Sequence, residues 1–134
     1  MHLVDTNVLS ELLKRTPNPR VIEWLARQTS VKVSVVSLME IEFGIARAPA
    51  TRRPTLLTWL ESILASPAHV VVPIDQAVAR AAGQLKHRTL AAGRPRPLSD
   101  LLIAASALVT GSVVVTRNVS DFEGLGVALL DPFA

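Results

Sequence analysis

Four carboxylates occupy positions from which they could share one site, although long stretches of chain separate them. Asp5 directly follows a short apolar run, and Glu40 comes soon after a β-branched run. Asp100 opens a long apolar stretch, and Asp121 stands a short distance beyond a run of valines. Acids brought together repel one another unless a cation neutralises them, and oxygen ligands without Cys or His select Mg²⁺ or Mn²⁺. The pattern predicts a carboxylate site for a divalent cation.

Such a site suits phosphodiester hydrolysis, because carboxylate-bound Mg²⁺ keeps several waters and also binds phosphate oxygens. A net charge of +3, from 14 basic and 11 acidic residues, favours a polyanionic partner. Arg117 and Asn118 follow a strand and are expected near the scissile phosphate. Two breaks between helices carry arginines that we expect to hold a nucleic-acid backbone: Arg47, Arg52, Arg53, Arg94 and Arg96.

Each of these groups also has a local explanation that the sequence leaves open. Asp5 is a good N-cap for a helix that starts at once after it. Ser37 with Glu40, and again Ser120 with Glu123, have the spacing of a capping box. The carboxylate that opens the long apolar helix is stabilised by the helix N-terminus in any case. The arginine clusters are equally typical of solvated helix faces.

Alternating short apolar runs and longer amphipathic stretches predict an α/β domain with a parallel sheet. Right-handed crossovers bring the carboxyl ends of such strands to one edge. Asp5, Glu40 and Asp121 would converge there, and Asp100 joins them if its helix starts at the same crevice. Asp75 is expected only to cap the helix that follows it. Strands are expected near residues 3–4, 31–36, 70–74, 112–115 and 127–130, and helices near 8–13, 21–28, 38–45, 56–64, 76–91 and 99–109.

Composition bounds the remaining possibilities. A chain of 134 residues, 49% hydrophobic and 4% aromatic, predicts a single domain, 1–134, with an aliphatic core. It has no cysteine, so disulfides and thiolate metal sites are excluded. The start of the chain lacks the features of a signal peptide, and no apolar stretch reaches transmembrane length. We therefore expect a cytoplasmic protein with no membrane partner.

Segments 4–11, 37–45, 100–105 and 115–122, in this order, resemble the motifs of PIN-domain ribonucleases. The resemblance covers essentially the whole chain and is closest to the VapC type of toxin from bacterial toxin–antitoxin pairs, in its FitB-like branch. It implies a central five-stranded parallel sheet flanked by helices, and a metal-dependent endoribonuclease that cuts RNA. It also implies a homodimer silenced by a cognate VapB-like antitoxin, and it allows for a higher-order complex that binds DNA through the antitoxin.

Carried over residue by residue, the resemblance makes Asp5, Asp100 and Asp121 ligands of Mg²⁺ or Mn²⁺. Glu40 becomes the acid that binds or orients the ion or its water. Glu42 stands where the family often has a basic or neutral residue, but its offset of two residues turns it to another helix face. The pocket around the acids is expected to be lined by Thr6, Asn7, Thr116, Arg117 and Asn118.

Two other functions can be weighed against this one. Phosphatases of the haloacid-dehalogenase type also begin with an Asp at a strand end, but they need a second Asp where this chain has Asn7. A catalytically inactive nucleic-acid-binding module would use the arginines alone. The four acids argue against the module, since clustered negative charge weakens phosphate binding.

Overall fold

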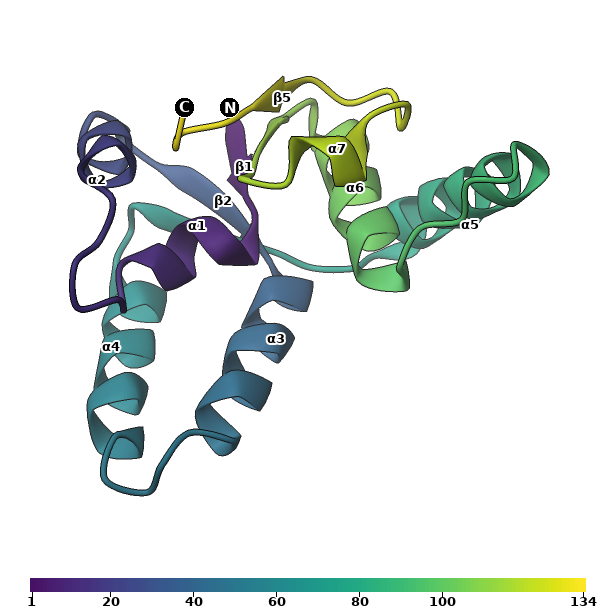
Figure 1. Cartoon of the computed structure of the whole chain (residues 1–134). Coiled ribbons are helices and arrows are strands. Elements are labelled where there is room, and N and C mark those ends of the chain that lie inside the picture. Colours follow the sequence, from purple (N-terminus) through teal and green to yellow (C-terminus); the bar gives the residue numbers. More distant parts are fainter.

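The computed structural model describes all 134 residues, and its centre is a five-stranded sheet in the order β3-β2-β1-β4-β5 (Figure 1). Every pair of neighbouring strands is parallel. The five parallel strands with flanking helices confirm the predicted fold class. The strands are β1 (His2–Val4), β2 (Val31–Ser34), β3 (His69–Val72), β4 (Val113–Val115) and β5 (Leu129–Leu130).

Helices connect these strands and cover the sheet. α1 packs on α3, α3 packs on α4, and α5 packs on α6. In Figure 1, α3 and α4 extend together below the sheet, and α5 projects to the right. No helix is both long and apolar enough to cross a bilayer. The helices are α1 (Thr6–Glu11), α2 (Pro19–Ala26), α3 (Val35–Ala46), α4 (Arg53–Ala65), α5 (Gln76–Ala91), α6 (Leu98–Thr110) and α7 (Val119–Phe122).

The sheet separates two apolar cores, and β1 contributes to both. Leu3 and Val114 are fully buried against the side chains of α5 and α6. Their neighbours Val4 and Val115 are fully buried in the other core, with side chains of α1, α3 and α4. Successive strand residues point to opposite faces, so strands covered on both sides are apolar throughout. That burial explains why the central strands appear in the sequence as short unbroken apolar runs.

The predicted boundary between the second strand and the third helix was wrong. β2 ends at Ser34, and Val35 and Val36 already belong to α3. The Ser34 side chain accepts a hydrogen bond from Val36 N at 3.1 Å and so caps the helix. Ser37 therefore lies inside the helix, fully buried, and does not form a capping box with Glu40. Glu40 loses the local explanation that its spacing suggested.

The second predicted capping box is also absent. α7 begins at Val119, its N-cap is Asn118, and no side chain caps it. Glu123 stands beyond the end of this helix in an extended conformation and cannot reach back to Ser120 as a cap. By contrast, the predicted cap at Asp75 is confirmed, because its carboxylate accepts a hydrogen bond from Val78 N at 2.9 Å.

Candidate active site at the carboxyl edge of the sheet

Asp5 immediately follows β1 and is 7% exposed. Its Oδ1 accepts a hydrogen bond from Thr6 N at 2.8 Å, which makes Asp5 the N-cap of α1. Its Oδ2 accepts from the Thr116 hydroxyl at 2.9 Å and from Asn7 Nδ2 at 3.1 Å. β1 and β4 are paired with Val4 opposite Val115. Asp5 and Thr116, the residues that follow, therefore lie next to each other. Asp5 is thus both a cap and a fixed carboxylate at the sheet edge.

Asn7 and Thr116 join the start of α1 to the loop after β4. Asn7 Oδ1 accepts a hydrogen bond from Arg117 N at 3.1 Å, and Asn7 Nδ2 lies 3.3 Å from the Thr116 hydroxyl oxygen. That oxygen also accepts from Asn118 N at 3.0 Å. These side chains hold the Asp5 carboxylate in place, as expected for residues that shape a site.

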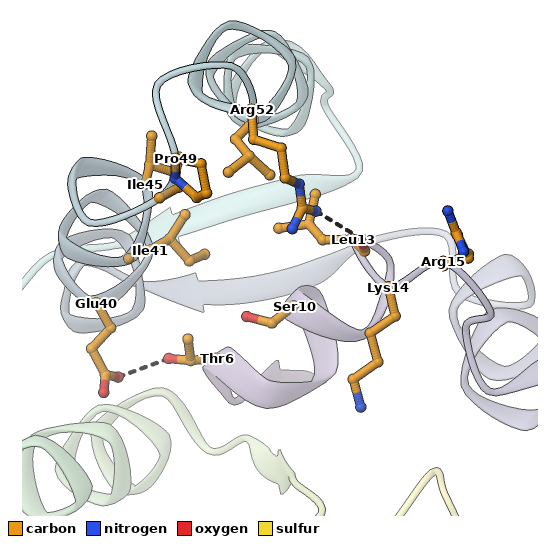
Figure 2. A pocket seen from close by; sticks show the side chains of 13 residues that line it. Thr6, Ser10, Leu13, Lys14, Arg15, Glu40, Ile41, Ile45, Pro49 and Arg52 are labelled. Carbon is orange, nitrogen blue, oxygen red and sulfur yellow. Dashed lines mark hydrogen bonds between the residues drawn. The ribbon is translucent and has the colours of Figure 1, made fainter.

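Glu40 approaches the same edge from α3 and is held by Thr6. Thr6 Oγ1 lies 2.8 Å from Glu40 Oε1 (Figure 2). It also lies 2.9 Å from Ser37 Oγ. A carboxylate only accepts and the Thr6 hydroxyl has one proton, so Thr6 donates to Glu40 and receives from Ser37. Glu42 is exposed, whereas Glu40 is half-buried. Sequence reasoning missed the role of Ser37, because its spacing from Glu40 suggested a cap.

Asp100 and Asp121 complete the set of acids from α6 and α7. Asp100 lies half-buried in the first turn of α6. Its side chain accepts no capping hydrogen bond there. Burial, and then the charges of Asp5, Asp121 and Glu40, raise the pKa of Asp100 to about 6. Burial also raises the pKa of Asp5, and hydrogen bonds from Thr116 and Thr6 oppose this. The four acids therefore act on one another electrostatically.

The carboxylate oxygens of the four acids are suitable ligands for a hard divalent cation, but they are not arranged as a complete ligand set. No group of three or more His, Asp or Glu side chains forms a ready ligand set in the structure. Mg²⁺ is commonly bound by only one or two carboxylates and keeps several waters in its shell. Burial and then the like charges of the other acids raise the pKa of Asp100, and a bound cation would relieve both effects by neutralising the carboxylates. The residues available for this are the buried Asp5 and the more exposed Asp100 and Asp121.

A cavity of about 910 Å³ opens beside Glu40 between α1, α3 and α4 (Figure 2). Thr6 and Glu40 line it near the site, and apolar side chains such as Ile45 and Leu56 line its walls. Arg52 also lines it and donates to the Leu13 carbonyl oxygen at 3.4 Å. We refer to this cavity as the α1–α4 groove.

The arginines predicted to bind RNA are placed in different surroundings. Arg47 lies over the Phe43 ring at 5.4 Å, and Arg53 Nε donates to the Ala48 carbonyl oxygen at 2.9 Å. Arg94 is exposed. None of these three contacts a carboxylate of the site, and their binding of RNA remains a prediction.

Arg96 and Arg117 are engaged elsewhere in the fold. The Arg96 guanidinium donates to three carbonyl groups in and after α7. No local sequence pattern predicts these contacts. The Arg117 guanidinium lies over the Phe133 ring at 4.9 Å. The structure therefore does not bring the Arg117 side chain to the acids, and its contact with a phosphate remains a prediction.

Residues 2–125 match the PIN domain, and the chain belongs to this family. It is 34% identical over 137 residues to the VapC ribonuclease Y4jK of Sinorhizobium fredii, covering 99% of this chain and 98% of that one. It is 31% identical over 137 residues to the toxin FitB of Neisseria gonorrhoeae, covering 99% of each. The crystal structure of FitAcB from Neisseria gonorrhoeae superposes with a TM-score of 0.91 at 32% identity, covering 99% of both chains. The predicted resemblance is confirmed.

Proposed function

We propose that this protein is a Mg²⁺- or Mn²⁺-dependent endoribonuclease and the toxin of a toxin–antitoxin pair. The observation that carries the proposal is electrostatic: burial raises the pKa of Asp100, and the charges of Asp5, Asp121 and Glu40, which follow β1 or lie on α7 and α3, raise it further. Family membership and relatives named as a VapC ribonuclease and a toxin support the same reading.

The residues of the chain have distinct tasks in this proposal. A bound cation would supply a water of lowered pKa and neutralise charge at the scissile phosphate. Thr116 and Asn7 orient Asp5, so that its carboxylate is preorganised before any ligand arrives. Thr6 donates to one oxygen of Glu40 and leaves Oε2 free to accept a proton from a water. Fixed orientation of this kind lowers the entropic cost of the reaction.

We also propose that the protein binds a cognate antitoxin. Toxins of this kind are silenced by an antitoxin, as the family resemblance implies, and the α1–α4 groove has both apolar and charged side chains in its lining, Glu40 among them. An antitoxin segment seated there would lie against the site and exclude RNA. Homodimerisation and DNA binding through the antitoxin belong to the same proposal.

RNA cleavage in three conditions tests the function. Wild-type protein with Mg²⁺ or Mn²⁺ should cut RNA, and EDTA or the Asp5→Asn variant should abolish cleavage. Circular dichroism of the variant checks that the fold is kept. Metal-independent RNA binding without cleavage by the wild type would contradict the proposal and favour a binding-only module.

A further inference from the structure

One guanidinium connects the segment before α6 to the short helix that carries Asp121. Arg96 Nη1 donates to the carbonyl oxygen of Ser120 at 3.1 Å and to that of Asp121. Arg96 Nη2 donates to the carbonyl oxygen of Glu123 at 2.9 Å. Helix carboxyl ends have unpaired carbonyl groups and a negative partial charge, so a cation is stabilising there. Arg96 thus caps α7 from a distant part of the chain.

α7 packs on α6 and β5, and Asn118 N at its start donates to the Thr116 hydroxyl, but no side chain other than Arg96 binds the carbonyl groups of the helix. It is four residues long, and the side chain of Asn118 at its N-cap accepts no capping hydrogen bond. Phe122, 1% exposed, fixes one face in the core. The chain after the helix passes through Gly124 and Gly126, whose φ values of 81° and 80° lie in the left-handed region. The exposed Asp121 carboxylate accepts no hydrogen bond, so its location follows from the backbone that carries it.

Arg96 is also close in sequence to the other acid of this half of the site. It precedes Asp100 by four residues, and Pro97 between them is the N-cap of α6. α6 and α7 are in contact, and Figure 1 shows them side by side. The guanidinium therefore joins the elements that carry Asp100 and Asp121.

We propose that Arg96 is a positioning residue that sets the place of Asp121 relative to Asp100 by clamping the carboxyl end of α7 to the start of α6. The proposal rests on the proposed function for the role of the two acids. The planar guanidinium is suited to the task, because its nitrogens are held in a rigid fork that reaches several acceptors at once. A lysine ammonium has the same charge but lacks this fork.

The experiment compares Arg96→Gln and Arg96→Lys with Arg80→Gln, all in the full-length chain. Arg80 is an exposed arginine of α5 that donates no side-chain hydrogen bond. Arg80→Gln therefore removes the same positive charge as Arg96→Gln without removing a hydrogen bond. Hydrogen exchange is measured for peptides spanning residues 119–125, and Mn²⁺ binding is measured by calorimetry without RNA. RNA binding is measured as a function of salt concentration.

Both Arg96 variants should speed exchange in residues 119–125 about tenfold, because local opening becomes easier. They should weaken Mn²⁺ binding by about tenfold, as loss of a supporting residue commonly does. Arg80→Gln should change neither quantity. The salt dependence of RNA binding should be the same in Arg96→Gln and Arg80→Gln.

Two results would overturn the clamp. One is unchanged exchange and Mn²⁺ affinity in Arg96→Gln with weaker RNA binding and a flatter salt dependence than Arg80→Gln, which would make Arg96 a direct phosphate contact. The other is full protection of residues 119–125 in Arg96→Lys, which would show that the fork is not needed. If the wild type neither binds Mn²⁺ nor cuts RNA, the proposed function fails, while the exchange data still decide the clamp.

Discussion

The Thr116 hydroxyl lies 2.9 Å from Asp5 Oδ2 across 111 residues of chain, and both side chains are buried. The contact joins the ends of the neighbouring strands β1 and β4. It gives the Asp5 carboxylate a donor that water would otherwise supply. The orientation of Asp5 therefore depends on the pairing of these two strands.

Replacing Thr116 by Val should damage both the site and the fold. The change removes the donor to Asp5 Oδ2 and the acceptor for Asn118 N. We expect a loss of about 1 to 3 kcal/mol in the free energy of unfolding, from buried groups left unpaired, measured by urea denaturation. We expect Mn²⁺ affinity to fall about tenfold or more. Thr116→Ser keeps the hydroxyl and serves as the control; equal losses in both variants would contradict the role of the hydrogen bond.

Asp100→Asn should stabilise the metal-free protein at neutral pH. The folded-state pKa of Asp100 is about 6, above the value of about 3.9 for an unfolded chain. The folded state then binds the proton more tightly, so stability falls as the pH rises through this interval and stays reduced above it. The variant should exceed the wild type by about 1 to 2 kcal/mol at pH 7, after allowance for solvent screening, and by little near pH 4.

Urea denaturation in EDTA from pH 4 to pH 8 measures this difference. Adding Mn²⁺ should narrow the gap at pH 7, because the cation stabilises only the protein that keeps the carboxylate. A stability difference that does not vary with pH would contradict the raised pKa that burial and the neighbouring acids give Asp100.

Glu40 and Glu42 provide a matched pair on one helix. Glu40 is half-buried and bound by Thr6, whereas Glu42 is exposed. Glu40→Gln should lower RNA cleavage by about 100-fold or more, the usual contribution of a group that moves a proton. Glu42→Gln should stay within about twofold, as surface changes generally do. Cleavage rates at saturating metal decide this, and equal effects of the two variants would refute the choice of Glu40.

Thr6→Val should reduce cleavage without unfolding the protein. The variant removes the donor that fixes Glu40 and leaves the buried Ser37 hydroxyl without its partner. We expect a rate about tenfold lower at saturating metal, in the range for residues that support a site. Thr6→Ser retains the hydroxyl and should restore most of the rate; failure of Ser to rescue would mean that the threonine methyl group matters instead.

The sequence predicted the order of elements well, because strands buried on both faces leave unbroken apolar runs such as that around Val114. It placed Asp5 at a strand end and Asp75 at a helix start, both of which rest on short-range patterns. Helix starts were harder to locate. Ser37 was expected to start the third helix, but Ser34 caps it and Val36, in its first turn, packs into the core.

Contacts between distant segments could not be predicted from local patterns. Arg96 was expected at an RNA backbone because it stands in an exposed basic loop, yet it donates to carbonyl groups of a helix that begins more than twenty residues later. Ser37 was expected to cap its own helix, yet it faces Thr6. Both contacts depend on how distant helices and strands pack against one another. The spacing of residues within one segment does not predict such packing.

β1 lies in the middle of the sheet, so the sheet is complete only when both of its neighbouring strands have been synthesised. β1 is made first, but its neighbour β4 and the Thr116 hydroxyl emerge only when about five-sixths of the chain has been synthesised. Until then, one flank of β1 has no strand beside it and Asp5 lacks its partner. The candidate site at this edge of the sheet therefore cannot form before β4 and Thr116 have been added to the chain.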